Sequence, residues 1–370
     1  MASLSVEERT AIQDSVRRLL ADHSGEAEVR RVMETPQGYD AELWRQLADL
    51  GVVGLLIDEA YGGVGAGPEE LERVMEEAGA ALLCAPLLSS GVLAAGLIQA
   101  LGDETDKARL LPAIADGSRI ATVALAAPRG DWTADDLAVQ ASASGETWRL
   151  NGQARFVAYG HVADLILVVA QTPDGPAVFE VEGQAPGASA HALPTFDHTQ
   201  RLTDLTFEAT PARRLASARP AWQAVEEALD LARVALAGEQ AGGARRVLEF
   251  TVDYAKTRVQ FGRSIGSFQA VKHMAADLLL ESESAVSAAR AAAKSLANGA
   301  ADAKAAISLA AFACADAFVQ TAATAIQMHG GIAFTWAHPA HLYLRRARAD
   351  AQLLGPPHLY RERYLEALGA

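Results

Sequence analysis

The chain has 370 residues, 50% of them hydrophobic, and a formal net charge of −14 at pH 7. This length and apolar content are enough to bury a large core, so we expect two or three subdomains. The negative charge repels nucleic acid and anionic membrane surfaces at long range and argues against both as partners. An anionic substrate would therefore need a local cluster of Lys and Arg side chains.

Residues 1–20 carry acidic side chains early and lack a long apolar core, which predicts an amphipathic helix and not a signal peptide. The most apolar stretches, such as 305–315, are bounded by charged residues and are predicted to be too short to span a bilayer. Cys84 and Cys314 lack metal-ligand spacing, and two cysteines do not make a disulfide framework. We therefore expect a cytoplasmic protein without a metal site, in which both cysteines are packing residues.

From the N-terminus to about Pro112, apolar residues recur at spacings of three and four, which predicts helices over 42–50 and 69–78. The glycine-rich run YGGVGAG at 61–67 lies within this region. It neither follows a clear strand nor opens a phosphate-binding helix, as a dinucleotide fingerprint does. We therefore interpret it as a structural loop.

Between about Ser118 and Leu215 the pattern changes to alternating and β-branched residues, which predicts strands. Asn151-Gly152 and Pro173-Asp174-Gly175 are predicted as turns between strands. The pattern indicates a small β domain. The predicted strands cover 120–124, 147–151, 165–170, 177–181 and 205–209.

From Ala221 to the end, the composition returns to long Ala- and Leu-rich helices, with breaks predicted at 262–267, 298–301 and 330–339. Alanine on facing helices permits close approach, as in a bundle. Helices, then strands, then helices are the order expected of an α+β protein that combines a bundle with a small barrel or sandwich.

Two stretches of the C-terminal half decide the family: YAKTRVQFGRSIGSFQA at 254–270 and QMHGGIAF at 327–334. They resemble the signatures of acyl-CoA dehydrogenases, in which an Arg, a Phe-Gly pair and a Gln are followed much later by a Gln and a Gly-Gly pair. The order of motifs follows the family over nearly the whole chain. Further similarity lies at 50–55, 61–63, 150–152, Ala163-Asp164 and Glu76-Glu77 before Gly79.

The resemblance implies a three-part fold, which we place as an N-terminal helical domain at 1–117, a central β domain at 118–219 and a C-terminal four-helix bundle at 220–370. It also implies FAD as cofactor, dimers or tetramers, an acyl-CoA substrate, and an electron-transfer protein as acceptor. In the family's reaction a carboxylate removes the proton next to the thioester carbonyl, and the neighbouring carbon gives hydride to the flavin. The product is a trans-2-enoyl-CoA, which places the family in lipid metabolism. An apolar enclosure raises the pKa of such a carboxylate toward neutrality and makes it a stronger base.

The resemblance implies that Arg258 pairs with the pyrophosphate of an FAD bound by a neighbouring subunit, since a guanidinium fork suits phosphate. The amides of Gln269 and Gln327 would bond the cofactor, and the Gly-Gly pair would allow close backbone approach. Taken singly, the Arg and Gln residues could be solvated, the glycines a helix-terminating turn, and the apolar residues ordinary core. The full predicted cofactor-binding set is Arg258, Gln260, Phe261, Ile265, Phe268, Gln269, Gln327, Gly330 and Gly331.

Positions expected to face the flavin of the chain itself depart from the family pattern. The family's Thr-Glu-Pro loop corresponds to AAPRGDW at 126–132, which has lost its hydroxyls and is shortened. The family's Trp-Ile-Thr stretch corresponds to Phe156-Val157-Ala158, which loses a further hydroxyl.

The catalytic carboxylate is absent from both positions where the family places it. One position corresponds to Leu354, before Gly-Pro, and the other to Ala232 on the long helix. Glu239 lies seven residues, about two turns, beyond Ala232 on the same helical face and is a candidate displaced base. The alternative is that Glu239 faces solvent in the field of the Arg245 and Arg246 pair.

The losses affect the chain's own flavin face, whereas the residues donated to a neighbour are present. This asymmetry resembles the degenerate partner subunit of heteromeric (α2β2) actinobacterial-type acyl-CoA dehydrogenases that act on steroid side-chain CoA thioesters. Three alternatives stay open: an independent homo-oligomeric dehydrogenase with Glu239 as base, a flavin monooxygenase on the same fold, and a non-catalytic scaffold. The identity of the acyl group stays open as well.

Overall fold

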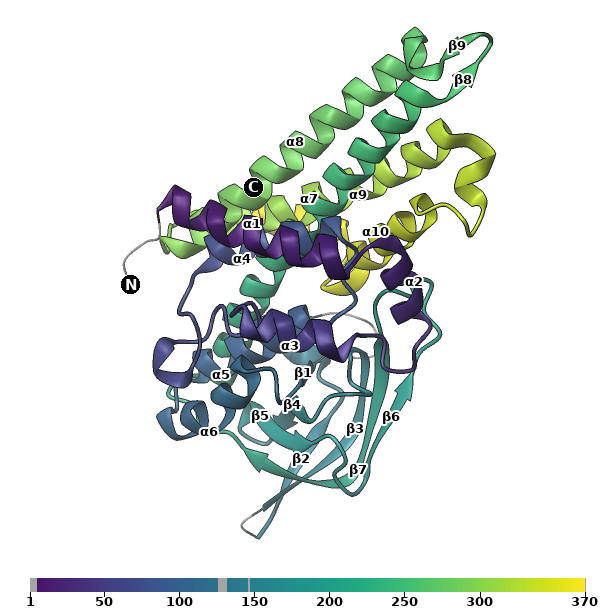
Figure 1. The fold of residues 1–370 in the computed structure, drawn as a ribbon. Coiled ribbons are helices and arrows are strands. Elements are labelled where there is room, and N and C mark those ends of the chain that lie inside the picture. The colour runs from purple at the N-terminus through teal and green to yellow at the C-terminus, as the bar shows by residue number, and fades with distance from the viewer. Residues whose placement is uncertain (1–4, 126–131, 146, 370) are drawn as a thin grey trace. The chain divides into compact units, whose positions relative to one another are not determined.

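The computed structural model describes residues 5–125, 132–145 and 147–369, and Figure 1 traces the chain by colour. The chain divides into two compact units. The β-rich unit comprises residues 32–67 and 84–232, and the helical unit comprises the residues up to 31, 68–83 and those from 233 onward. The three-domain boundaries after residues 117 and 219 stay a prediction.

The strands of the β-rich unit close into a barrel. The order β4-β2-β3-β7-β5 returns to β4, because β5 pairs with both β7 and β4. β1 adds to β4 in parallel, and β6 adds to β7 in antiparallel fashion. The strands are β1 (Ala121–Ala124), β2 (Gln140–Ser144), β3 (Thr147–Ala158), β4 (Leu165–Thr172), β5 (Gly175–Glu182), β6 (Ala188–Ala192) and β7 (Leu202–Arg214).

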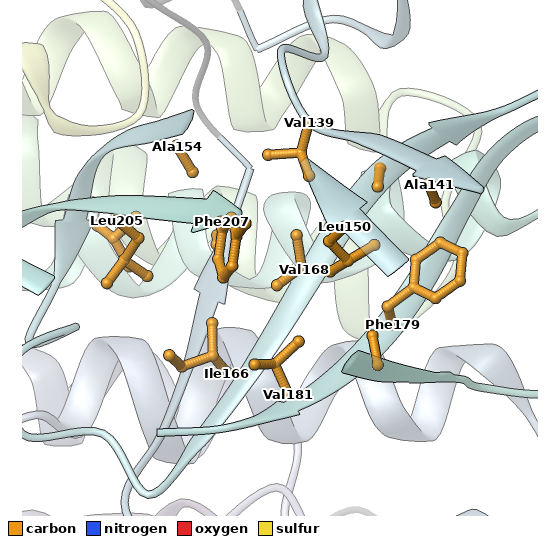
Figure 2. Close-up of a cluster of buried hydrophobic side chains, with 14 of the residues drawn as sticks. Val139, Ala141, Leu150, Ala154, Ile166, Val168, Phe179, Val181, Leu205 and Phe207 are labelled. Atoms are coloured by element: carbon orange, nitrogen blue, oxygen red, sulfur yellow. The ribbon is translucent and has the colours of Figure 1, made fainter. Parts of the chain in front are cut away.

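Apolar side chains that point inward fill this barrel (Figure 2). Leu150 of β3, Phe179 of β5 and Phe207 of β7 are at most 1% exposed. The Trp148 ring packs against Phe179 with 5.3 Å between ring centroids. Buried positions on β3 are separated by accessible ones, as expected when one face of a strand lines a core. The barrel interior is therefore a packed core that holds the surrounding loops in place.

All five predicted strands are confirmed, but β2 and β6 were not predicted, because QASAS and ASAHA carry little of the β-branched and aromatic signal. The turn predicted at Asn151-Gly152 is wrong. These residues lie inside β3, where the register with β7 shifts between Leu150 and Gly152, which marks a β-bulge. A Cβ at Gly152 would meet the Ala138 carbonyl oxygen at 2.4 Å, so the close approach of that backbone requires glycine.

Helices of the β-rich unit pack beside the barrel strands of the same unit. The Trp44 indole donates to the Gly117 carbonyl at 2.9 Å, and Arg109 reaches both oxygens of Glu180 on β5, at 2.7 and 2.5 Å. The loop predicted at 61–67 is confirmed between Tyr61 and the start of the next helix. These helices are α3 (Ala41–Asp49), α5 (Ala95–Leu101) and α6 (Glu104–Ala115), with the π-helix η2 (Leu87–Ala94) and the 3-10 turns η1 (Glu59–Tyr61) and η3 (Ala134–Asp136).

The helical unit contains the breaks that the sequence predicts, after α7, after α8 and after α9. A short hairpin joins α7 to α8 and projects beyond the helix ends in Figure 1. The helices are α1 (Val6–His23), α2 (Glu26–Met33), α4 (Pro68–Ala80), α7 (Ala221–Thr257), α8 (Gln269–Ala297), α9 (Ala303–His329), α10 (Ala340–Leu353) and α11 (Pro357–Ala367). The hairpin is β8 (Val259–Gln260) with β9 (Arg263–Ser264), and the 3-10 turns are η4 (Ile265–Ser267) and η5 (Gly330–Phe334).

Small side chains let α7, α8 and α9 approach closely, as predicted. Ala237, Ala289 and Ala310, one from each helix, are at most 1% exposed within one cluster. Cys314 is buried in the same cluster, which confirms it as a packing residue, and burial raises the pKa of its thiol. The apolar helix extends beyond the predicted 305–315 stretch: within the described ranges, Ala303–Phe334 is long and apolar enough to cross a membrane by length and composition. Many of its side chains are buried against α8, as in a core helix.

Two helices of this unit, α4 and α7, cross in backbone contact. A Cβ added at Gly79 would meet the Glu239 carbonyl oxygen at 1.9 Å, and one added at Gly242 would meet the Glu76 carbonyl oxygen at 1.8 Å. No larger residue fits at either position without separating the helices. This crossing places the acidic face of α4 inside the unit.

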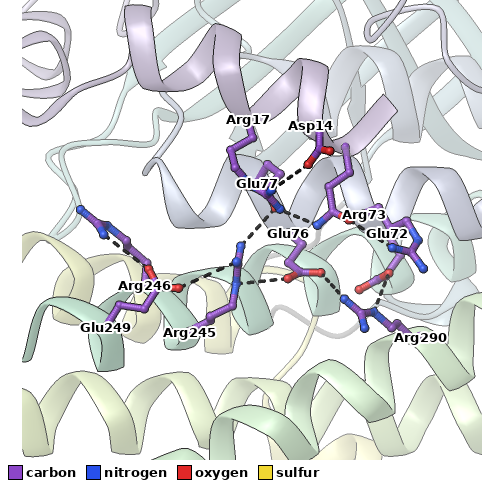
Figure 3. Close-up of polar contacts among 11 residues, drawn as sticks. Asp14, Arg17, Glu72, Arg73, Glu76, Glu77, Arg245, Arg246, Glu249 and Arg290 are labelled. Carbon is purple, nitrogen blue, oxygen red and sulfur yellow. Dashed lines mark hydrogen bonds and ion pairs between the residues drawn. The ribbon is translucent and has the colours of Figure 1, made fainter. Parts of the chain in front are cut away.

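Arginines from three other helices neutralise the α4 carboxylates (Figure 3). Arg17 of α1 bonds Glu77 at 2.9 Å. Arg245 of α7 and Arg290 of α8 contact the two oxygens of Glu76 at 3.2 and 3.1 Å. Since Glu76 and Glu77 are at most 4% exposed, these pairs compensate charges that have lost their hydration.

Candidate cofactor site and active site

The residues predicted to contact FAD gather at one end of the helical unit. Leu248 of α7, Leu278 of α8 and Met328 of α9 form a single buried cluster there. Arg258 follows α7 directly, Gln269 is the first residue of α8, and Gln327 precedes Met328. The packing of three helix ends therefore brings together two motifs that are far apart in the sequence.

Backbone contacts shape the hairpin that carries Arg258. The Arg258 amide donates to the Tyr254 carbonyl at 2.8 Å, and the Ile265 amide donates to the Arg258 carbonyl at 2.8 Å. At the hairpin tip Phe261 has a φ of 53° and is 92% exposed. Its ring meets the Phe268 ring edge-on at 6.2 Å. Phe261 is thus no core residue, and its strained backbone presents an aromatic ring to solvent.

The polar members of the predicted set also face outward. Arg258, Gln260, Gln269 and Gln327 are exposed, and Ile265 and Phe268 are half-buried. Gly330 has a φ of 66°, and a Cβ at Gly330 or Gly331 would meet no described atom within 4 Å. A cation, three amides and an uncovered backbone therefore face the space in front of this end. These are groups that a dinucleotide with a pyrophosphate and a planar ring system can use, so the residues present fit FAD.

Large apolar side chains are exposed in the same two segments. Exposed apolar groups that cluster on a soluble protein mark an interaction surface. Among the described residues these side chains are Val259, Phe261, Ile332, Phe334 and Trp336, between 46% and 92% exposed.

The positions that the resemblance assigns to the family's catalytic carboxylate are occupied by buried apolar residues. Leu354, just after α10, is 4% exposed. The Tyr360 hydroxyl donates to the Leu354 carbonyl and accepts a hydrogen bond from Arg233 Nε at 3.3 Å. The second position, Ala232, is fully buried. Neither side chain can take a proton.

Sequence reasoning missed a buried carboxylate next to Leu354. Asp350, one helical turn earlier on α10, is 1% exposed and lines a small cavity together with Arg233 and Leu354. Asp350 lies four residues before Leu354 in the sequence, but this spacing brings the two close only if the segment is helical. The burial of Asp350 depends on the packing of α10 within the unit.

Glu239 does not face solvent, so that alternative is wrong. It is 4% exposed, and Arg346 of α10 donates to its carboxylate at 2.5 Å. Arg346, itself 1% exposed, also donates to the Leu83 carbonyl at 3.3 Å. The crossing at Gly79 covers the Glu239 backbone, and Arg346 covers its carboxylate. A role of Glu239 as base stays a prediction.

In the β-rich unit, the 156–158 segment forms the end of β3. Phe156 has a φ of 57° and is 40% exposed, with the Arg155 guanidinium 4.9 Å from its ring centroid. The Ala158 carbonyl accepts a hydrogen bond from the Thr122 hydroxyl at 2.7 Å, and the alanine itself offers no hydroxyl. The other altered segment, 126–131, lies outside the described residues, so its loss of hydroxyl groups is known from the sequence alone.

Comparison with known families gives the same assignment for both ends of the chain. Residues 6–118 match the acyl-CoA dehydrogenase N-terminal domain, and residues 222–368 match the acyl-CoA dehydrogenase C-terminal domain. The chain belongs to the acyl-CoA dehydrogenase family. It is thus a member of a family of FAD-dependent oxidoreductases, and it has that family's fold.

Several relatives are similar over almost their full length. Acyl-CoA dehydrogenase IpdE2 of Mycobacterium tuberculosis is 36% identical over 95% of this chain and 94% of its own. Among solved structures, a variant of the Tcur3481-Tcur3483 steroid ACAD is 34% identical with a TM-score of 0.89, covering 98% of each chain. The ChsE4-ChsE5 complex from Mycobacterium tuberculosis is 30% identical with a TM-score of 0.90, covering 100% of this chain and 99% of the other.

Proposed function

We propose that this chain is a half-site subunit of a heteromeric acyl-CoA dehydrogenase, and that its exposed end completes an FAD site held mainly by a partner subunit. One contrast carries the proposal: Leu354 is buried where the family has its base, whereas Arg258 and Phe261 are exposed where the family serves a neighbour's cofactor. Support also comes from the two solved relatives, each of which is described by a pair of chain names.

Each residue of the exposed end has a separate task in this proposal. Arg258 binds the pyrophosphate, Gln269 and Gln327 hold polar edges of the cofactor, and Phe261 covers its rings and excludes water. The open backbone at Gly331 lets the cofactor approach closely. When bound, FAD accepts the hydride that leaves the acyl-CoA substrate. In this proposal the α-proton is removed by a carboxylate of the partner, because Leu354 and Ala232 cannot act as a base and the Glu239 carboxylate is paired with Arg346.

Flavin counting tests the proposal directly. The chain is purified alone and after coexpression with a family member that carries a Glu at the position of Leu354 or Ala232, and flavin absorbance and assembly mass are measured. We expect little FAD in the chain alone and fewer flavins than chains in the complex, since each hydrogen bond lost at a buried cofactor costs roughly 1 kcal/mol. One tightly held FAD per chain in a homo-oligomer, reduced by an acyl-CoA, would overturn it in favour of an independent enzyme.

Arg258→Ala in the complex tests the residue assignment. A charge-assisted hydrogen bond contributes about 1.5–3 kcal/mol, so FAD affinity should fall roughly 10- to 100-fold without a change in Tm. Arg348→Ala, which removes an exposed arginine of α10, is the matched control and should leave FAD affinity unchanged. Equal losses in both variants would contradict the assignment.

A further inference from the structure

An aromatic and histidine cluster lies directly behind the exposed end. The Tyr254 ring of α7 stacks on the His329 ring at the end of α9, with 4.4 Å between centroids and 27° between planes. The Tyr254 hydroxyl donates to the His329 carbonyl at 3.4 Å. His338 lies 4.5 Å from His329, and Phe250 lies 5.6 Å from it, both as ring-centroid distances. Tyr254 and His329 thus join α7 to α9 through both ring and backbone contacts.

The stack of Tyr254 on His329 adjoins both segments of the proposed cofactor surface. The Tyr254 carbonyl accepts the Arg258 amide at 2.8 Å, so a displacement of Tyr254 shifts the start of the hairpin. His329 directly precedes Gly330 and is two residues from Gln327. The spacing between Arg258 and the Gly-Gly turn is therefore set by a stack of two rings.

We propose that Tyr254 and His329 are positioning residues that hold the two cofactor-donating segments in register, and that protonation of His329 at acidic pH weakens FAD binding by opening their stack. The inference rests on the proposed function, because it concerns the same FAD site.

The surroundings of His329 favour its neutral form. His329 is 5% exposed and its Nδ1 lies 2.8 Å from the Ala325 carbonyl, which can only accept, so Nδ1 carries the proton of the neutral ring. Burial lowers the pKa of His329 and also that of His338. A proton added to His329 would place a cation 4.5 Å from the second imidazole. Among the described residues, the other titratable or charged groups around this cluster and its cavity are Arg17, Glu26, Arg30, Glu77, Arg245, Arg246, Glu249, His341 and Tyr343.

A cavity gives protons a path to the stack. Tyr254, His329 and His338 line a cavity of about 850 Å³ within the helical unit, whose other walls include Leu20 of α1 and Leu342 of α10. The rings of Tyr254, His329 and His338 thus lie within the protein but remain in contact with a cavity that water can enter. Opening the stack has room to occur in this space without displacing another helix.

The test is FAD affinity of the coexpressed complex, measured by equilibrium dialysis between about pH 5 and pH 8. We expect wild-type affinity to begin to fall below about pH 6.5, the ordinary pKa of a histidine, and to fall several-fold toward pH 5, because burial lowers the pKa of the stacked His329 below that value. His329→Phe keeps a stacking ring without a titrating nitrogen, and it should retain affinity at high pH and flatten the profile. His329→Ala should lower affinity at every pH, and Tyr254→Ala should lower it by roughly 10-fold.

Arg258→Ala separates the failure of this inference from the failure of the proposed function. If Arg258→Ala weakens FAD binding but His329→Ala and Tyr254→Ala do not, the positioning role is wrong and the proposed function stands. If the pH profile is unchanged in His329→Phe but flattened in His338→Phe, the group that titrates is His338 and not His329, and the inference is overturned. If Arg258→Ala has no effect, the proposed function itself fails.

Discussion

Two regions of the helical unit are predicted to correspond to two different sites of the family. They differ in whether polar side chains are exposed to solvent or buried. At the exposed end, Arg258, Gln269 and Gln327 lie in solvent, where a polar side chain costs the fold little. Around Leu354 the surroundings are buried, and each polar group must be paired or replaced by an apolar one. If the proposed function holds, the difference teaches that a subunit can fill its catalytic position with core while the polar groups of its exposed end stay in place.

The buried region should respond most strongly to mutation. Glu239→Ala removes a buried carboxylate that pairs with the Arg346 guanidinium, itself 1% exposed, and should lower the free energy of unfolding by about 3–5 kcal/mol. The measurement is urea denaturation followed by circular dichroism. Replacing Glu239 and Arg346 together with Met removes both charges of the pair and should recover part of the loss. A Glu239→Ala variant as stable as wild type would show that this pair is not part of the core.

The next largest effect is expected when a carboxylate is introduced at Leu354. Leu354→Glu places an ionisable group in a site that is 4% exposed and should cost about 2–4 kcal/mol of stability. Leu354→Met, which nearly conserves volume, should cost less than about 1.5 kcal/mol. We also expect no bleaching of flavin by acyl-CoA in the purified Leu354→Glu chain. Bleaching in that variant would mean that the two regions still form one working site.

A smaller effect concerns the α4 carboxylates. Burial, followed by the neighbouring Glu76, raises the pKa of Glu72 to about 8 from 4.5. Because the folded state holds this proton more tightly, its contribution to stability is full below about pH 4.5 and is lost as the pH rises toward 8.

Glu72→Gln removes this titration. Between about pH 5 and pH 8 the wild type should therefore lose roughly 1–3 kcal/mol more stability than the variant, measured by urea denaturation at each pH. The matched control is Glu249→Gln, because Glu249 is largely exposed and its loss should leave the pH dependence as in wild type. Parallel pH curves for wild type and Glu72→Gln would show that Glu72 ionises freely in the folded chain.

The exposed region should show the smallest change in stability. Phe261 is 92% exposed, so Phe261→Ser should alter the free energy of unfolding by no more than about 0.5 kcal/mol. The same variant should reduce the FAD content of the coexpressed complex. Thermal unfolding and flavin absorbance measured on one preparation compare the two effects. If Phe261→Ser lowers the free energy of unfolding but leaves the FAD content unchanged, Phe261 contributes to the fold and not to cofactor binding, which contradicts the prediction.

The sequence predicted the elements well where the signal is local. Apolar runs rich in β-branched residues located β4 and β5, and the glycines located the end of α9. Two features could not be predicted from the sequence. The bulge at Gly152 depends on its contact with Ala138, and the burial of Glu239 depends on α4 crossing α7 at Gly79. Both are set by backbone approach between segments far apart in the chain, which a periodic pattern does not encode.

The predicted site divides in the same way. Motif spacing grouped Arg258 with Gln269 and, by resemblance, with Gln327, and the structure gathers them at one end of the unit. The stack of Tyr254 on His329 lies within the quoted motifs but gave no signal of its own, because the contact requires two helices to be packed first. Resemblance to a family thus indicates candidate cofactor contacts more readily than the residues that pack behind them.

The division of the chain between its two units has a consequence for synthesis on the ribosome. The β-rich unit is complete once residue 232 has emerged, but α1 and α4 belong to the unit that continues from residue 233. Until then Glu76 lacks Arg245 and Arg290, its partners from α7 and α8. α1 is therefore synthesised before the β-rich unit but docks after it, and folding in the order of synthesis cannot apply to this helix. A nascent chain that stalls before α8 would carry two amphipathic helices without a core, which is a substrate for chaperones and proteases.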